Sequence, residues 1–212
     1  MKKFNAGSIA LCLSMLCAMP AVADNGSGVG SHSNFSYTQL GIDIGKATPD
    51  QDIVFYGERY EEFGAASLSG SYQLDNNLAV EIGAAAIANN GPRTEITNSS
   101  LAVNLLVPIP VGSRLDIVPH FGFGKFKSEF CIDNDCRSQD DSAALYGIGL
   151  RAWVLPNAFE LNGGVSDSTL EDSETSVAIG AALWASKNHR FALDYEGSSS
   201  ISVVTIGYSY NW

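Results

Sequence analysis

The sequence repeats one pattern along most of its length: a large apolar residue at every second position. The last ten residues, VVTIGYSYNW, show it well, because Val204, Ile206, Tyr208, Tyr210 and Trp212 alternate with small or polar residues. A period of two places successive side chains on opposite faces of a β-strand. Each segment of this kind would therefore have one apolar face and one small or polar face.

Ten such segments follow one another, with no stretch of helical periodicity between them. Most have ten or more residues, whereas the strands of soluble proteins average about five or six. A tilted strand of about ten residues spans the hydrocarbon core of a bilayer. The predicted strands are 34–45, 62–74, 78–89, 97–107, 114–126, 142–155, 158–167, 174–185, 189–197 and 200–212.

The connections between these segments differ in length. Four are tight and rich in turn-forming residues, namely LDNN, PIPVGSR, LPNA and SKNH. Longer, more acidic segments alternate with them, at 46–61, 90–96, 127–141 and 168–173. Bacterial outer-membrane barrels combine short periplasmic turns with long extracellular loops. We therefore expect an all-β fold, a transmembrane antiparallel up-and-down β-barrel with ten strands, or eight as the alternative.

A soluble β-sandwich would show the same alternation, because it buries one face of each strand against a second sheet. The length of the strands, the asymmetry of the connections and the many small residues on the polar face favour the barrel. In a barrel the last strand pairs with the first, so that the sheet has no free edge. The aromatic face of the last strand would then contact lipid, with Trp212 at the membrane interface.

The first 23 residues have two lysines, a short apolar stretch and a small-x-small ending, Ala21-Val22-Ala23. This is the pattern of a secretory signal peptide. A membrane anchor would need a longer, unbroken apolar stretch. We predict a cleaved signal peptide at 1–23, a flexible lead-in at 24–33 and the barrel at 34–212.

Cleavage would remove Lys2 and Lys3 and change the formal net charge from −11 to −13. Such an acidic chain without a basic stripe is unsuited to nucleic acid. Of the four cysteines, Cys131 and Cys136 would remain, in an outer loop exposed to an oxidising compartment. They indicate a disulfide; the alternative, a metal site, lacks a nearby histidine or second cysteine pair. We expect no metal and no cofactor.

The inward face carries a group of charged residues near the periplasmic end. Because successive strand residues point to opposite faces, Arg151 is predicted to point inward, as the one basic residue that does so in the periplasmic half of the barrel. Asp116 and Glu160 lie on the two neighbouring strands and are predicted to point inward as well. Glu81 lies at comparable depth and Asp194 slightly higher. Charges in a confined, weakly hydrated space need partners. We predict an ionic cluster in the lumen, which either packs a polar interior or forms a plug or gate.

Five phrases of the chain resemble the small outer-membrane β-barrel proteins of Gram-negative bacteria: FSYTQLGIDIG, SGSYQLDNNLAVEIGAAA, RLDIVPHFGFGKF, ALYGIGLRAWVLPNAFELNGGV and TIGYSYNW. The resemblance implies a monomer in the outer membrane, in contact with outer-membrane lipid and lipopolysaccharide. It also implies that Tyr208, Tyr210 and Trp212 form the C-terminal signal read by the outer-membrane assembly machinery. It says little about function.

The positions of the three histidines do not indicate a catalytic site. His32 lies in the lead-in, His189 in a turn, and His120 in a strand without an identifiable Ser or Asp partner. Eight to ten strands leave little room for a channel. We expect a non-catalytic protein that acts in surface interaction or envelope maintenance through loops 46–61 and 127–141, which could contact a host or surface ligand. A narrow passive pore is the alternative, and a lipid- or peptide-hydrolysing enzyme a more distant one.

Overall fold

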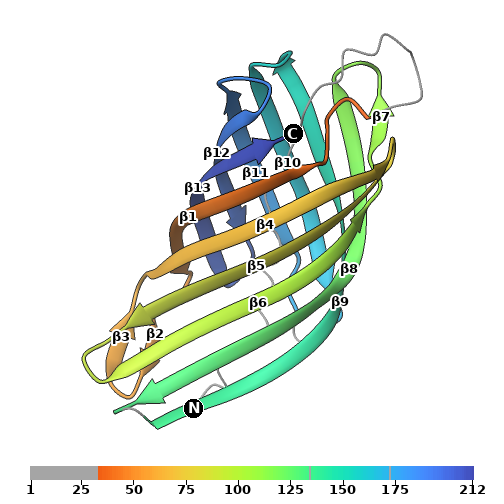
Figure 1. The fold of residues 1–212 in the computed structure, drawn as a ribbon. Coiled ribbons are helices and arrows are strands. Elements are labelled where there is room, and N and C mark those ends of the chain that lie inside the picture. The colour runs from red at the N-terminus through yellow and green to blue at the C-terminus, as the bar shows by residue number, and fades with distance from the viewer. Residues whose placement is uncertain (1–32, 134, 172) are drawn as a thin grey trace.

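The computed structural model describes residues 33–133, 135–171 and 173–212. Ten long strands form a closed antiparallel barrel (Figure 1), because β6 pairs with β8 and β1 pairs with β13. The barrel strands are β1 (Gln39–Pro49), β4 (Phe63–Asp75), β5 (Leu78–Asn90), β6 (Thr94–Leu106), β8 (Leu115–Ile132), β9 (Asp135–Leu155), β10 (Phe159–Ser168), β11 (Ser176–Trp184), β12 (His189–Gly197) and β13 (Ile201–Asn211). The predicted ten-stranded barrel is confirmed.

Three short strands lie outside this barrel count. The strands β2 (Ile53–Phe55) and β3 (Glu58–Tyr60) form a separate hairpin within the first outer connection. The strand β7 (Ile109–Val111) pairs only with the start of β8, in the turn that joins β6 to β8. Among the described residues, no helix is long and apolar enough to cross a membrane. The predicted signal peptide and nearly all of the lead-in lie outside the described residues.

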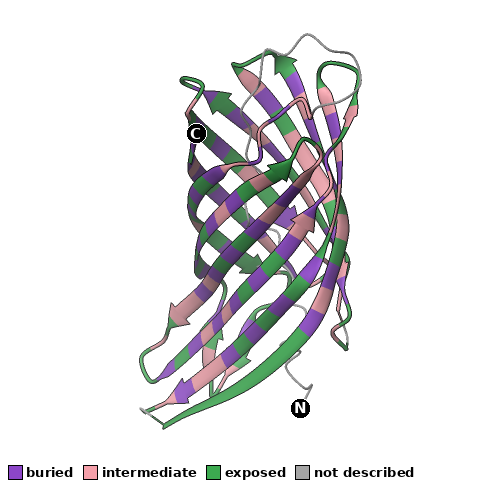
Figure 2. Cartoon of the chain, turned by 45° about the vertical axis from the view of Figure 1, so that its right-hand side comes forward, coloured by how far each residue is buried: buried purple, intermediate pink, exposed green. Residues whose placement is uncertain are grey.

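The two faces of the barrel differ as the period of two requires. Along each strand exposed and buried residues alternate (Figure 2), and the exposed ones are large and apolar, such as Ile44, Phe123 and Ile206. Apolar side chains exposed over a whole sheet would be unfavourable in water but suit contact with lipid. The inward face is mostly small or polar, with residues such as Asp43, Ser69 and Asn104 buried.

The first and last strands pair without interruption from Gln39 opposite Asn211 to Pro49 opposite Ile201. The first strand therefore begins at Gln39, not at residue 34 as predicted. The preceding residues 33–38 leave the sheet and enter the barrel interior, where Phe35 and Tyr37 are almost completely buried. Both are aromatic residues in a segment whose alternation resembles a strand, so periodicity alone could not separate the two arrangements.

The expectation of a long outer loop at 127–141 was wrong. β8 stays paired with β6 as far as Ile132 opposite Thr94, whereas β9 extends past the end of β10, and only residues 133 and 134 lie between β8 and β9. The hairpin protrudes at the lower left of Figure 1, and residues 127–140 are called the protruding hairpin below. In β9 residues 135–142 are exposed on both faces and mostly polar, so this part of the strand lacks the alternating apolar signal of the other strands.

We expect Trp212 to matter more for assembly than its neighbour Asn211. The Trp212 side chain is 60% exposed on the lipid side, whereas Asn211 points inward and is fully buried. Trp212→Ser should reduce the yield of folded protein in the membrane severalfold, and Asn211→Ser should reduce it less. Heat-modifiable gel mobility of both variants in membrane fractions measures this, and equal folded yields would contradict the role of Trp212.

Candidate functional site

The most deeply buried charges of the barrel meet at Glu160, near the end with the short turns, which outer-membrane barrels place in the periplasm. Arg151 donates to Glu160 Oε1 through Nε at 2.9 Å and through a terminal nitrogen at 2.6 Å. Both side chains are completely excluded from solvent. The Trp184 indole donates to Glu160 Oε2 at 3.1 Å. The carboxylate is thus held by a charged partner and a neutral one.

A second arginine, Arg190, completes this centre. Its Nε lies 3.3 Å from Glu160 Oε2, and its side chain is 1% exposed. From the sequence, Arg151 was predicted to be the one basic residue on this part of the wall. The alternation of β12 could have indicated that Arg190 points inward, since it is two residues from Ala192 and four from Asp194 on the same face. It was missed because it lies next to a predicted turn, where the alternation is short. We call Arg151, Arg190 and Glu160 the ionic centre.

The other predicted cluster members have different partners. Asp116 lies opposite Arg151 in the register of β8 and β9, but its oxygens accept hydrogen bonds from residues of the segment 33–38. Glu81 accepts a hydrogen bond from Asn104 at 3.3 Å. Asp194 interacts with Asn162 on β10. Within the described part of the chain, Glu160 is the one predicted carboxylate that forms an ion pair with Arg151.

Residues 33–38, the N-terminal plug, lie inside the barrel between the ionic centre and the short turns, where the Asn34 side chain donates to the main-chain oxygens of Gly112 and Leu115. The Phe35 ring stacks on Trp153 with a centroid distance of 4.8 Å, and the Arg151 guanidinium lies 4.5 Å from the Phe35 centroid. Stacked aromatic rings and a cation over a ring face are both favourable contacts. The plug therefore closes the lumen with an aromatic layer attached to a buried cation.

Hydrogen bonds attach the N-terminal plug to the wall. The main-chain N–H of Asn34 donates to Asp116 at 2.9 Å, and the Asn34 side-chain amide donates to it at 2.8 Å. The Tyr37 hydroxyl donates to the same carboxylate at 3.2 Å. The Trp153 indole donates to the main-chain oxygen of Asn34 at 3.3 Å. A carboxylate that accepts this many hydrogen bonds is stabilised without a full ion pair.

The opposite end of the lumen is closed by apolar side chains. The β2–β3 hairpin contributes Ile53 and Tyr60, which are almost fully buried against the inner wall. They belong to one buried cluster with Ala47, Phe63, Ala65, Ala85, Ile87, Ile96, Ile201 and Val203. Both ends of the barrel are thus filled by described residues.

Polar contacts fasten the β2–β3 hairpin to the rim. Glu58 accepts hydrogen bonds from the main-chain N–H of Arg93 at 3.0 Å and from the main-chain N–H and side-chain hydroxyl of Thr94. The Thr94 hydroxyl is the main cause that lowers the pKa of Glu58 below its usual value. Arg93 donates to Asp133 with its Nε at 3.0 Å and with a terminal nitrogen, which lowers the pKa of Asp133.

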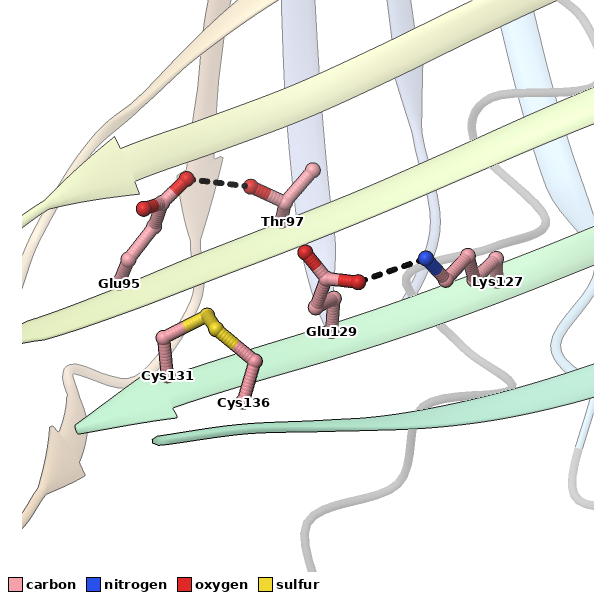
Figure 3. The surroundings of a disulfide bond; sticks show 6 residues. All are labelled: Glu95, Thr97, Lys127, Glu129, Cys131 and Cys136. Atoms are coloured by element: carbon pink, nitrogen blue, oxygen red, sulfur yellow. Dashed lines mark hydrogen bonds and ion pairs between the residues drawn. A yellow bond between two sulfur atoms is a disulfide. The ribbon is translucent and has the colours of Figure 1, made fainter. Parts of the chain in front are cut away.

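A disulfide joins Cys131 and Cys136 at the end of the protruding hairpin (Figure 3), where the two residues lie directly opposite each other. Glu129 lies nearby, and its carboxylate and the two sulfur atoms are within 4.8 Å of one another. The sulfurs are bonded to each other, so they are not the thiolates that bind a metal. Glu129 pairs instead with Lys127, as the dashed line in Figure 3 marks.

His120 points toward the lumen in β8 and is half-buried. Its Nδ1 has no hydrogen-bond partner among the described residues. A catalytic histidine in a nucleophile–base arrangement needs a Ser or Asp within hydrogen-bond distance. No hydrogen bond of this kind to His120 is found in the described part of the chain.

We expect Arg151→Ala to lower the free energy of unfolding by about 3–5 kcal/mol, because it breaks the closest buried pair and removes the cation under Phe35. Arg190→Ala is the matched control and should cost less, since its contacts with Glu160 are 3.3 and 3.4 Å long. Urea unfolding in lipid vesicles, followed by tryptophan fluorescence, measures both. Equal losses, or no loss for Arg151→Ala, would contradict the ionic centre.

The rim contact should depend on pH. The folded state lowers the pKa of Glu58 and of Asp133, so the contacts stabilise the rim above the ordinary carboxyl pKa of about 4 and are lost as pH falls through the lower folded values. The amide NMR signals of Arg93 and Thr94 should therefore titrate with midpoints below about 4. In Glu58→Gln the titration of the Thr94 signal should disappear while Arg93 still reports Asp133, and midpoints above about 4 would contradict the assignment.

The comparisons with known proteins agree with this architecture. Residues 8–211 match the family model described as outer membrane protein beta-barrel domain. No curated protein matches the chain in sequence. Two solved structures that match the chain are Ail, the attachment invasion locus protein of Yersinia pestis, and the outer membrane protease OmpT from Escherichia coli. Ail has 15% identity and a TM-score of 0.45 over 82% of this chain and 99% of its own.

OmpT has 11% identity and a TM-score of 0.50 over 82% of this chain and 97% of its own. At such identities the likeness concerns the fold. The family match covers nearly the whole chain, and the ten-stranded barrel has the lipid-facing surface that such a location requires. The chain belongs to the outer-membrane β-barrel family and is a protein of the bacterial outer membrane.

Proposed function

We propose that this protein is a non-catalytic surface-interaction protein that binds a ligand outside the cell through the protruding hairpin. The observation that carries the proposal is the exposure of the outer end of β9. Residues 135–142 are exposed at every position, on both faces of the strand, unlike the alternating pattern of the rest of β9. A sheet segment exposed on both faces serves neither the core nor lipid contact, so interaction with another molecule is its best-supported role.

The hairpin is also held in a fixed shape. It continues the ladder between β8 and β9 without a register shift, from Leu115 opposite Ala152 to Ile132 opposite Asp135. The Cys131–Cys136 disulfide and the Arg93–Asp133 pair hold its tip. A surface ordered before binding loses less conformational entropy when a ligand binds.

Two features argue against the alternative functions. A passive pore needs an open path, whereas aromatic and apolar residues fill both ends of this lumen. A hydrolase of the histidine-dependent type needs a partner for His120, and its Nδ1 has none among the described residues. Both observations support a role at the surface. Envelope maintenance is the version of this role in which the ligand is another component of the same cell.

The test shortens the hairpin and also removes the pairing of residues 128–132 with residues 94–98 of β6, so the fold of the variant is verified by heat-modifiable gel mobility. Deletion of residues 128–139 and closure with an Asn-Gly turn joins Lys127 to Asp140, which are already opposite each other. Bacteria that display this variant in folded form should lose at least tenfold in adhesion or serum survival, while detergent sensitivity stays unchanged.

The matched control is Tyr56→Asn, at the tip of the β2–β3 hairpin, where Tyr56 is 76% exposed. Asn tolerates the left-handed backbone at this position, φ 49°. This variant should keep adhesion and survival. Full activity of the shortened variant would overturn the proposal, as would conductance of the wild-type protein in planar bilayers. Detergent sensitivity of the shortened variant alone would favour envelope maintenance.

A further inference from the structure

The lumen contains more carboxylates than cations. In the described barrel strands, the inward-pointing charged side chains are Asp43, Glu81, Asp116, Glu160, Asp194 and Glu196 against Arg151 and Arg190. Glu160 pairs with both arginines, and Asp116 lies opposite Arg151, so these two acids are enough to balance the two cations. The other four carboxylates share a narrow space in which an uncompensated charge is costly.

Glu81 is the one of these four that lies in a row of oxygen-bearing side chains. The register pairs it with Ser71 of β4 on one side and with Asn104 of β6 on the other. Directly opposed residues of a sheet have Cβ atoms about 4.5–5.5 Å apart. All three side chains point inward and are buried. A carboxylate, an amide and a hydroxyl are thus neighbours away from solvent, and we call Ser71, Glu81 and Asn104 the oxygen row.

Each member of the oxygen row has an acceptor atom that no described residue satisfies. The Asn104 amide donates to Glu81 Oε1 at 3.3 Å. Glu81 Oε2, Asn104 Oδ1 and Ser71 Oγ have no hydrogen-bond partner among the described residues. Buried polar atoms are nearly always paired in proteins. Three such acceptors on neighbouring strands therefore indicate a bound group that donates hydrogen bonds or carries positive charge.

A glycine makes room for the amide oxygen of this row. The residue opposite Asn104 on β8 is Gly122. A Cβ atom at Gly122 would lie 2.3 Å from Asn104 Oδ1, closer than two such atoms can approach. Glycine within a strand often marks a close approach of this kind. The wall of β8 is therefore shaped around the position of the Asn104 oxygen.

The chemistry of the oxygen row selects a small cation. Water could donate to the three acceptors, but it would leave the charge of Glu81 in place. Carboxylate, amide and hydroxyl oxygens are hard ligands that suit alkali and alkaline-earth ions. The oxygen row has a single formal negative charge, so a monovalent ion would leave the site neutral. A divalent ion would add positive charge to the lumen that holds Arg151, which acts on Glu81 through space.

Glu196 shows what the other members of the oxygen row contribute. It is buried like Glu81 and interacts with the Ser176 hydroxyl. Its neighbours in the register are Ala178 and Val203, whose side chains offer no oxygen ligand. A buried carboxylate alone does not make a cation site, whereas Glu81 has a neutral oxygen ligand on each side.

We propose that the oxygen row binds a monovalent alkali cation, sodium, inside the barrel. Glu81 is the charged ligand, and Asn104 and Ser71 are the neutral ones. The bound ion would link β4, β5 and β6 and balance one of the surplus lumen charges. The proposal departs from the expectation of no metal, because the sequence does not show which acceptors are left without partners. It is independent of the proposed role of the protruding hairpin.

The first experiment compares salts at equal ionic strength. The full-length protein is unfolded in urea and refolded in lipid vesicles at about pH 8.5, where protons compete less for the carboxylate. A cation at ten times its dissociation constant multiplies the folding equilibrium constant about elevenfold. Sodium chloride should therefore raise the midpoint of urea unfolding by about 0.5–1 M relative to choline chloride, whose cation is too large for the oxygen row. Calcium chloride should raise it less than sodium chloride.

The second experiment changes the ligands. Glu81→Gln keeps the size of the side chain and removes its charge, so the difference between sodium and choline should disappear. Ser71→Ala removes one neutral ligand and should raise severalfold the sodium concentration that gives half of the shift. Asp116→Asn is the matched control, because this lumen carboxylate already accepts hydrogen bonds from the N-terminal plug. It should lower the midpoint in both salts and keep the difference between them.

Heat-modifiable gel mobility verifies that each variant is folded in both salts. Equal midpoints of the wild-type protein in sodium and choline would overturn the site and would mean that Glu81 is protonated or hydrated. A larger shift in calcium than in sodium would overturn the monovalent assignment. A sodium effect that persists in Glu81→Gln would place the ion elsewhere and overturn the site as well. If Glu81→Gln does not fold, an unchanged sodium dependence of Ser71→Ala decides against the oxygen row.

Discussion

Closure of the sheet is the constraint on which the rest of this structure depends. In a bilayer no water satisfies the main-chain N–H and C=O groups, so every strand needs a neighbour on both sides. The pairing of β1 with β13 and of β6 with β8 meets this requirement around the barrel. It also sets the alternation of side chains, because every outward residue contacts lipid and every inward residue shares one narrow lumen.

That narrow lumen explains the ionic centre and the N-terminal plug. Arg151, Arg190 and Glu160 have no access to solvent and must satisfy one another. The N-terminal plug adds an aromatic layer over Arg151 and supplies the donors that Asp116 requires. The apolar cluster at the outer end fills the other opening. The barrel therefore serves as a rigid, closed support, and the groups that remain available for interaction lie above its rim.

The constraint ends where the membrane ends. Beyond the rim water can solvate main-chain groups, so β9 can continue past the last residue of β10 with one side unpaired. Within the barrel β9 is therefore paired on both sides, and beyond the end of β10 it is paired on one side only. The disulfide and the Arg93–Asp133 pair keep this extension ordered. This rigid extension is the part of the described chain most available for contact with another molecule.

The sequence by itself predicted the barrel, ten strands with eight as the alternative, and the face on which most strand side chains lie, because a period of two is a local property that every segment repeats. It also placed Arg151 and Glu160 on the inward wall of adjacent strands. Three features were decided by tertiary structure alone. Residues 33–38 alternate like a strand, yet they enter the lumen because Asp116, Trp153 and Arg151 offer partners there that no local pattern reveals. Arg190 reaches Glu160 across β11, because β12 and β10 lie on either side of that strand and both side chains point into the same narrow lumen. Residues 127–141 look like a polar loop, yet they form strands because cross-strand pairing, and not contact with lipid, holds them.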